Sequence, residues 1–214
     1  MDYLKLLKVG GVAVALAIAA NACMNKKTES LLRPCQALGR VLAEEAMRAA
    51  GANKTIAVIS PDSRWGPAST LEAALRSTLR ARGYSVMVAK LAYLGDPMKM
   101  SGVGLQRGDF YEAVQKAANA GALVSIVGAP LLTPAEATPL PAGHPPILVA
   151  AVASLGEEPG SPGNRAILED LLRAKIIQIA IVDGGSQDGL STASQTNSVR
   201  ALFDQNYRIL REPD

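Results

Sequence analysis

Short apolar runs alternate along this chain with segments in which apolar residues recur every three or four positions. A continuous apolar run is typical of a strand buried on both faces of a sheet, whereas the longer period indicates a helix with one buried face. We predict strands at 55–60, 85–91, 123–128, 147–153 and 176–182, with a sixth, edge strand at 207–210. We predict helices at 34–50, 69–82, 109–119, 161–172 and 198–205. The alternation predicts a three-layer α/β sandwich with a mostly parallel, Rossmann-like sheet of five to six strands.

Polar residues near the predicted helix starts have the spacing of caps. Ser69 with Glu72 forms a capping-box pattern, and Asp109 with Glu112 repeats it for the next helix. In the helix that begins at Ser161 and Pro162, four apolar residues define the predicted inner face: Ile167, Leu168, Leu171 and Leu172. Two connections lack any such period, a proline-rich segment at 130–146 and a polar loop at 183–197. We expect both to lie on the surface.

The first 22 residues have the layout of a secretory signal. Lys5 and Lys8 precede an uncharged apolar stretch at 9–22, whose last residues, Ala20-Asn21-Ala22, offer small side chains to a signal peptidase. Cys23 stands directly after Ala22, which resembles a bacterial lipoprotein signal in which that cysteine is lipidated. An uncleaved N-terminal membrane anchor and simple secretion stay open as alternatives. Each of the three predicts an extracytoplasmic domain, in the periplasm or at the cell surface.

The leader divides the chain into three predicted parts. Residues 1–22 are the signal peptide or anchor, residues 23–33 a polar tether, and residues 34–214 a single α/β domain. The second cysteine, Cys35, falls in the first predicted helix. We expect it to be a buried apolar residue, and a disulfide with Cys23 or with another chain stays open.

The composition restricts the partners and the chemistry. The chain has 214 residues, with 22 Lys and Arg against 19 Asp and Glu, and a formal net charge of +3. These charges are scattered singly, so we expect no nucleic acid partner. Two cysteines and one histidine exclude a four-cysteine or Cys2His2 zinc site. We assign no metal, no cofactor and no catalytic residue.

In an open parallel sheet, ligands bind beyond the carboxyl ends of the strands. The loop after the first predicted strand carries a carboxylate, a hydroxyl, a guanidinium and the only indole of the chain: Asp62, Ser63, Arg64 and Trp65. This set suits a small polar ligand stacked on an aromatic ring, although the same residues also suit a turn packed against the sheet edge. After the fifth strand, Asp183 and Ser186 lie in a glycine-rich loop whose amides suit an anion.

The common signatures of nucleotide binding and hydrolysis are missing from these loops. The loop at 183–189 lacks the lysine of a phosphate-binding loop, and the glycines at 102–108 do not follow a predicted strand. A serine hydrolase requires His144, the single histidine, together with Ser60 or Ser63 as the nucleophile. No Gly-x-Ser-x-Gly sequence follows a strand.

Two stretches resemble one lobe of the type I periplasmic binding proteins. They are the stretch at 54–91, which begins KTIAVISPDS and ends in LRARGYSVMVAKL, and AVQKAANAGALVSIVGAP at 113–130. The resemblance implies a lobe that binds a sugar or an amino acid through Asp62, Arg64 and Trp65. That family closes two lobes over its ligand, whereas this chain is long enough for one.

These observations lead to one expected function and two alternatives. We expect a membrane-tethered, extracytoplasmic, non-catalytic accessory, assembly or binding subunit of a cell-envelope complex. Its partners are then the membrane, through the N-terminus, and other envelope proteins, with 130–146 and 183–197 as contact surfaces. The alternatives are a single-lobe protein that binds a small solute and a hydrolase of the cell envelope.

Overall fold

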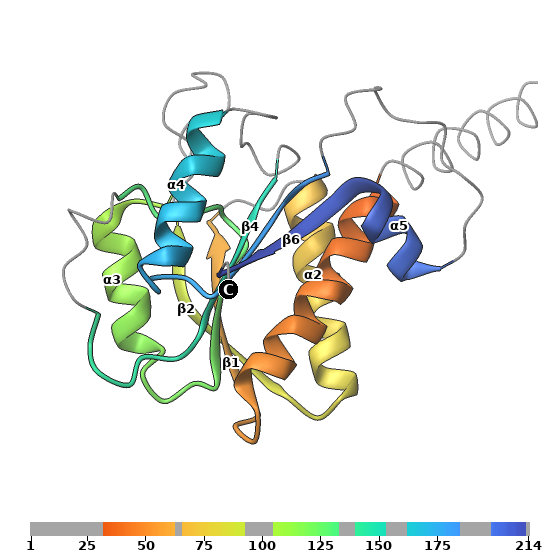
Figure 1. Ribbon diagram of the computed structural model, residues 1–214. Helices are drawn as coiled ribbons and strands as arrows, with labels where there is room; N and C mark the ends of the chain where they lie inside the picture. Colours follow the sequence, from red (N-terminus) through yellow and green to blue (C-terminus); the bar gives the residue numbers. More distant parts are fainter. Residues whose placement is uncertain are drawn as a thin grey trace, which may run out of the picture. The chain divides into compact units, whose positions relative to one another are not determined.

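A computed structural model describes residues 32–62, 66–92, 105–132, 140–152, 162–184 and 198–212 (Figure 1). The chain divides into two compact units, Met1–Arg33 and Pro34–Asp214. The fold described below is that of the second unit. The leader, Cys23 and the residues up to 31 lie outside the described residues.

The second unit contains a six-stranded sheet with the strand order β2-β1-β3-β4-β5-β6. The first five strands are parallel, and β6 pairs antiparallel with β5. The central strands are buried on both faces, as their continuous apolar runs predict. The strands are β1 (Thr55–Pro61), β2 (Ser85–Ala92), β3 (Ala122–Ser125), β4 (Ile147–Ala151), β5 (Ile179–Asp183) and β6 (Tyr207–Arg211). The predicted α/β sandwich with a mostly parallel sheet is confirmed.

Helices cover both faces of this sheet, as Figure 1 shows. One face is covered by α3 (Arg107–Lys116) and α4 (Pro162–Arg173). The other face is covered by the N-terminal helix (residues 32–50), α2 (Gly66–Ala81) and α5 (Val199–Asn206). This distribution follows from the strand order, because α2 leads from β1 to one side and α3 leads back across β1 to the other.

The N-terminal helix packs through small residues. Gly39, Ala43, Ala46 and Ala50 recur at helical spacing, and all four are buried. A Cβ atom added to Gly39 would lie 2.4 Å from the carbonyl oxygen of Leu71 in α2. The absence of a side chain at Gly39 therefore allows the two helix backbones to approach closely.

The far end of the same helix is held by a second glycine. A Cβ atom on Gly121, directly before β3, would lie 2.6 Å from the carbonyl oxygen of Asn53 and 2.7 Å from the Cβ of Ala50. The amide of Gly121 donates to the carbonyl of Thr55 at 2.7 Å. The end of the helix, the start of β1 and the start of β3 thus meet at the amino edge of the sheet.

A buried carboxylate joins the first helix to the last strand. Glu45 is only 2% exposed, and its Oε2 accepts from Arg211 of β6 at 2.7 Å and from Arg48 at 2.6 Å. Two guanidinium groups thus compensate the buried negative charge, which is costly to bury alone. Cys35, on the same helix, is 3% exposed, which confirms the expected burial.

Both predicted capping boxes are wrong. Helix α2 begins at Gly66, three residues before Ser69, and α3 begins at Arg107, with Gln106 as its N-cap and no side-chain cap bond. The acidic residues of both patterns bind partners on neighbouring elements instead, as described below. Tertiary charge pairing has replaced the local hydrogen bonds that the pattern predicted.

Other predicted details also differ in the structure, and β3 ends at Ser125 and not at 128. Ile167 is 39% exposed, so the inner face of α4 consists of Leu168, Leu171 and Leu172. Strand β5 begins at Ile179 and not at 176, because the chain turns at Lys175, which has a left-handed φ of 56°.

The packing of Gly39 makes a stability prediction. We expect Gly39→Ala to lower the free energy of unfolding by about 1 to 3 kcal/mol, because the new methyl group overlaps backbone atoms that cannot rotate away. Urea unfolding followed by circular dichroism measures the change.

Gly108→Ala is the matched control for this substitution. Gly108 lies in the first turn of α3, and an added Cβ atom meets nothing within 4 Å. We expect this variant to be neutral or more stable by at most about 1 kcal/mol, since alanine favours helix. Equal stability of the two variants would show that the helices do not approach as closely as described.

Candidate functional site

The strand order places the candidate site at the carboxyl ends of β1 and β3. The connection after β1 leaves toward one face of the sheet, and the next crossover, from β2 through α3 to β3, lies on the other face. Neighbouring strands whose connections diverge leave a crevice between their carboxyl ends, and the order 2-1-3-4-5 has this point between its first and third strands. Residues at these two strand ends are therefore the first candidates.

At the end of β1, a buried hydroxyl is bound to an ion pair. Ser60 is 2% exposed, and its Oγ donates to Oε1 of Glu72 at 3.0 Å. The same oxygen accepts from Nε and from a terminal nitrogen of Arg76, both at 2.7 Å. Glu72 and Arg76 are a turn apart on α2. The capping-box interpretation missed this cluster, although the four-residue spacing of opposite charges was a readable signal.

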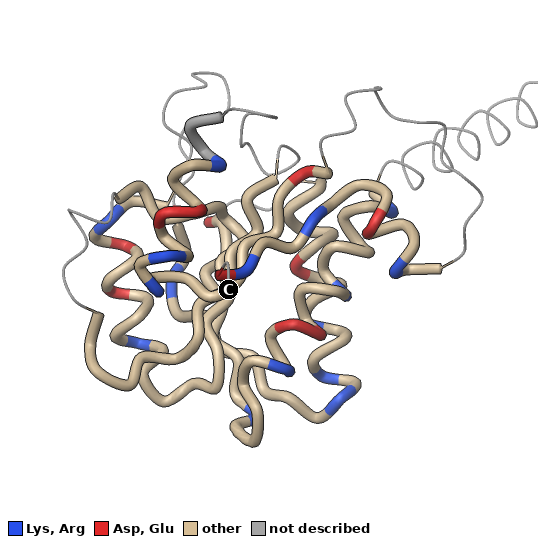
Figure 2. Tube along the Cα trace, viewed as in Figure 1, with Lys and Arg blue, Asp and Glu red and all other residues tan. Residues whose placement is uncertain are grey.

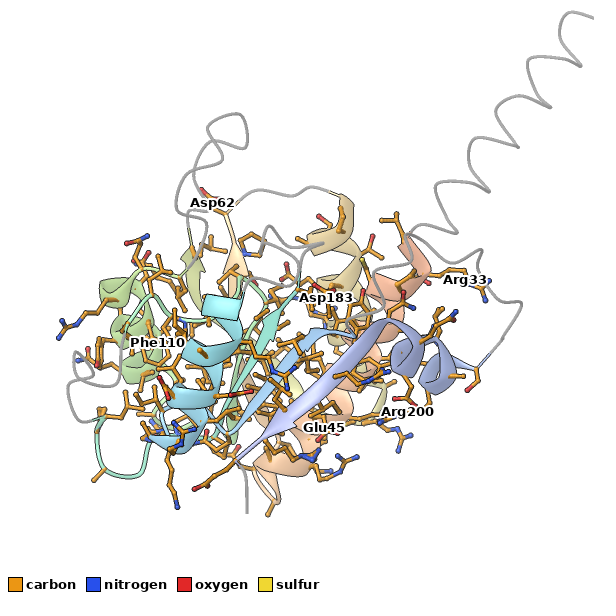
Figure 3. The ribbon with its side chains drawn as sticks, turned by 45° about the horizontal axis from the view of Figure 1, so that its top comes forward. Arg33, Glu45, Asp62, Phe110, Asp183 and Arg200 are labelled. Carbon is orange, nitrogen blue, oxygen red and sulfur yellow. The ribbon has the colours of Figure 1, made fainter. Side chains whose placement is uncertain are left out.

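Asp62 follows Ser60 and Pro61 at the tip of this edge. Its side chain is exposed, as Figure 3 shows, and its amide donates to the carbonyl of Ala92 at 3.0 Å. That bond ties the ends of β1 and β2 together. The structure thus places the predicted carboxylate in solvent beside the switch point. Ser63, Arg64 and Trp65, predicted as its neighbours in the site, lie outside the described residues.

The end of β3 is closed by a side-chain hydrogen bond. Ser125 is 1% exposed, and its Oγ donates to the carbonyl of Gly128 at 2.7 Å. Gly128 has a φ of 91°, a conformation that favours glycine. The chain then runs back beside Leu105, whose carbonyl accepts from the amide of Leu131 at 2.8 Å. The side chain of Leu131 is half-exposed, so this edge presents an apolar group next to the polar strand ends.

Asp183 lies at the same edge but far from Asp62. It ends β5, where it is paired with Tyr207, and it is half-buried. Two strands separate β5 from β1, so three interstrand spacings, roughly 14 Å, divide the two carboxylates. One small ligand does not contact both. Ser186, predicted beside Asp183, lies outside the described residues.

A charge cluster fixes α3 against β2. Nζ of Lys90 lies 2.8 Å from Asp109 and 2.5 Å from Glu112, and Lys116 approaches Glu112 at 2.7 Å. The hydrogen bond from Lys116, followed by that from Lys90, lowers the pKa of Glu112 to about 2. The hydrogen bonds that Lys90 donates to Asp109 and Glu112 raise the pKa of Lys90. The cluster holds the first turns of α3, and with them Leu105, near the strand ends.

The arrangement does not bring a histidine to these serines. His144 lies three residues before β4, and the strand register places Ile147 level with Leu123. Ser60 is about six residues further along the strand direction, roughly 20 Å away. His144 thus lies at the amino edge, where its Nδ1 is 2.9 Å from the carbonyl oxygen of Pro145. The hydroxyls of Ser60 and Ser125 donate within the protein.

The described residues contain no group of three or more His, Cys, Asp or Glu arranged to hold a metal ion. In the same ranges, no helix combines the length and the apolar character needed to cross a bilayer. What the described part of this edge offers chemically is the exposed carboxylate of Asp62 and the half-exposed apolar side chain of Leu131.

No protein-family model matches the chain. No curated protein sequence matches it. A solved structure, the periplasmic ribose ABC transporter from Conexibacter woesei DSM 14684, matches with 13% sequence identity and a TM-score of 0.42. The match covers 69% of this chain and 45% of that chain, so this chain corresponds to less than half of its length.

The lowered pKa of Glu112 makes a prediction about pH. A carboxylate whose pKa is lower in the folded than in the unfolded protein stabilises the fold at any pH above its unfolded pKa of about 4.5. That stabilisation is lost as the pH falls toward the folded pKa of about 2. We expect Glu112→Gln to be less stable than the parent protein near neutral pH, with the difference shrinking as the pH falls from 4.5 to 2.

Urea unfolding at a series of pH values measures this difference. Glu169→Gln is the control, because Glu169 forms an exposed pair with Arg165 four residues earlier on α4. Such a pair contributes little to stability. A Glu112→Gln deficit that stays constant down to pH 2 would contradict the account of the cluster.

Proposed function

We propose that this protein is a membrane-tethered, extracytoplasmic, non-catalytic binding domain that serves as an accessory or assembly subunit of a cell-envelope complex. It recognises its partner through the carboxyl edge of the sheet. The observation that carries the proposal is the switch point between β1 and β3, where Asp62 is exposed and Leu131 presents an apolar group. A charged and an apolar group at the carboxyl ends of neighbouring strands suit recognition.

The tether is supported by the sequence of the leader. An uncharged stretch follows Lys5 and Lys8, and Cys23 stands where a lipoprotein cysteine stands. Lipid on Cys23 attaches the domain to a membrane. One acyl chain binds a bilayer only weakly, so stable attachment needs further acyl chains or a bound partner.

The non-catalytic part of the proposal rests on how two buried serines of the described strand ends use their hydroxyl groups. Ser60 donates to the carboxylate of Glu72, which also accepts from Arg76. Ser125 donates to a backbone carbonyl. A serine nucleophile instead donates to a base that accepts its proton. His144 lies at the opposite edge of the sheet.

A second candidate is a single-lobe protein that binds a small solute. The observation that favours it is the same switch point, since folds with this strand order bind small ligands there. The resemblance of residues 54–91 to type I periplasmic binding proteins agrees with this candidate. A single lobe encloses only one side of such a ligand.

Native mass spectrometry of the full-length protein, extracted from its own membranes in mild detergent, tests the proposal. We expect a chain that begins at acylated Cys23 and is bound to other subunits. We expect Asp62→Arg to weaken the complex at least tenfold, about 1.4 kcal/mol, because the substitution reverses a charge at the proposed contact. Glu44→Arg, an equal charge reversal at an exposed position of the N-terminal helix, leaves binding unchanged.

Two other outcomes of this experiment would replace the proposed function. An unlipidated monomer that carries a small non-covalent mass favours the solute-binding candidate, which thermal stabilisation by that solute then checks. Turnover of an envelope substrate, lost in a variant at a strand end, would replace both candidates with an enzyme.

A further inference from the structure

Strand β2 forms one edge of the sheet, and its outer side is open to another strand. In the described sheet, β2 has β1 as its single neighbour. Among its eight residues, SVMVAKLA, Lys90 is the one charged residue. Proteins protect sheet edges with charged side chains, proline or short strands, because unpaired amides and carbonyls bind other chains. Lys90 gives β2 little protection, since Asp109 and Glu112 of α3 bind its ammonium group.

The opposite edge of the sheet has the protection that β2 lacks. Strand β6 has five residues, and two of them, Arg208 and Arg211, are exposed arginines. On β2, by contrast, Val88 is 45% exposed and Leu91 is 57% exposed. The sheet therefore has one charged edge and one apolar edge.

The direction of the backbone groups of β2 follows from its pairing with β1. The amide of Ser85 and the carbonyl of Ala92 bond to the residues that flank β1, at 2.8 and 3.0 Å. Successive backbone groups of a strand point to opposite sides, so those of Val86 and Val88 point away from β1. The register then shifts at Ala89, which is skipped in the pairing. The regular stretch of the open edge is therefore 85–88.

We propose that β2 pairs antiparallel with β2 of a second copy of this chain, about a two-fold axis at Met87, and joins the two sheets into one. Val86 of each copy then lies opposite Val88 of the other, and their outward amides and carbonyls form about four hydrogen bonds. This inference does not rest on the proposed function, because it involves neither the N-terminal segment nor the carboxyl edge of the sheet.

The strand itself excludes the neighbouring registers. A two-fold axis at Val88 would require Lys90 to bond outward, beyond the bulge at Ala89. An axis at Val86 would require the amide of Tyr84, which already donates to the carbonyl of Leu79 at 3.0 Å. The axis at Met87 uses only backbone groups that point outward.

The side chains and charges beside this axis are compatible with a second copy. Val86 and Val88 meet across the axis, and β-branched cross-strand pairs stabilise a sheet. Lys90 falls opposite Tyr84, so the lysines of the two copies lie about 20 Å apart. Helix α3, which packs on β2, carries two basic and two acidic residues, and Figure 2 shows both colours along it. The two copies therefore do not present surfaces of one charge sign to each other.

A second copy also explains why only one edge is protected. A two-fold axis uses the same surface of both chains, so the assembly closes at two. The joined sheet then ends in β6 on both sides, where Arg208 and Arg211 are exposed. No apolar edge strand is left open. A partner of another kind would cover β2 without this symmetry.

Disulfide formation at the axis tests the pairing. In a non-hydrogen-bonded antiparallel pair the two Cα atoms lie about 4.5 Å apart, a distance that a disulfide spans. We expect full-length Met87→Cys, oxidised mildly in whole cells, to yield severalfold more disulfide-linked dimer than the parent chain, whose Cys35 is buried. Peptide mass spectrometry then identifies a bond between residue 87 of both copies.

Ser85→Cys is the matched control, on the same strand and more exposed than Met87. In the proposed register the two copies of residue 85 lie four positions apart along the strand, about 13 Å, which a disulfide does not span. We expect this variant to stay at the background level. Equal or greater linkage of Ser85→Cys, no dimer from Met87→Cys, or a disulfide with a different protein overturns the inference.

Val88→Pro in the Met87→Cys background tests the backbone hydrogen bonds. Proline lacks an amide hydrogen, but the amide of Val88 points outward, so β2 keeps its hydrogen bonds to β1. We expect the yield of linked dimer to fall severalfold, whereas Val88→Thr, which keeps the amide, leaves it unchanged. Thermal unfolding followed by circular dichroism checks that both variants fold. An unchanged yield from folded Val88→Pro overturns the pairing.

Discussion

The close approach of the N-terminal helix to its neighbours is the constraint on which this structure depends. Gly39 and Gly121 leave room for backbone atoms of Leu71 and Asn53 where a Cβ atom would overlap them. Because of these two contacts, the helix covers one face of the buried central strands and runs opposite to β1. The pair of Glu45 with Arg211 then joins it to the last strand.

The class of fold was predictable because it depends on patterns that the chain carries locally. Apolar runs and helical periods identified all six strands and the helices between them. The helix starts were not predictable in this way. Glu72 binds Ser60 and Arg76, and Asp109 binds Lys90, and these partners become neighbours only when the sheet has formed. The close approach at Gly39 is equally invisible in a one-dimensional pattern.

The sequence predicted the edge of the sheet at which the candidate residues lie, but not which of them lie close together. The rule for parallel sheets placed Asp62 and Asp183 at one edge, and both lie there. The rule does not predict that two strands separate β1 from β5, because strand order is a property of the assembled sheet. The same order separates His144 from Ser60, which the sequence left as a candidate pair.

The central claim is that the domain recognises its partner through the carboxyl edge of the sheet. Hydrogen exchange of the full-length protein, compared in its native membranes and after purification away from them, tests this claim most directly. The account predicts that amides near the ends of β1 and β3, including Asp62 and Leu131, are protected only in native membranes. Amides at 51–54 then exchange alike in both. Protection confined to 51–54, or no difference anywhere, would contradict it.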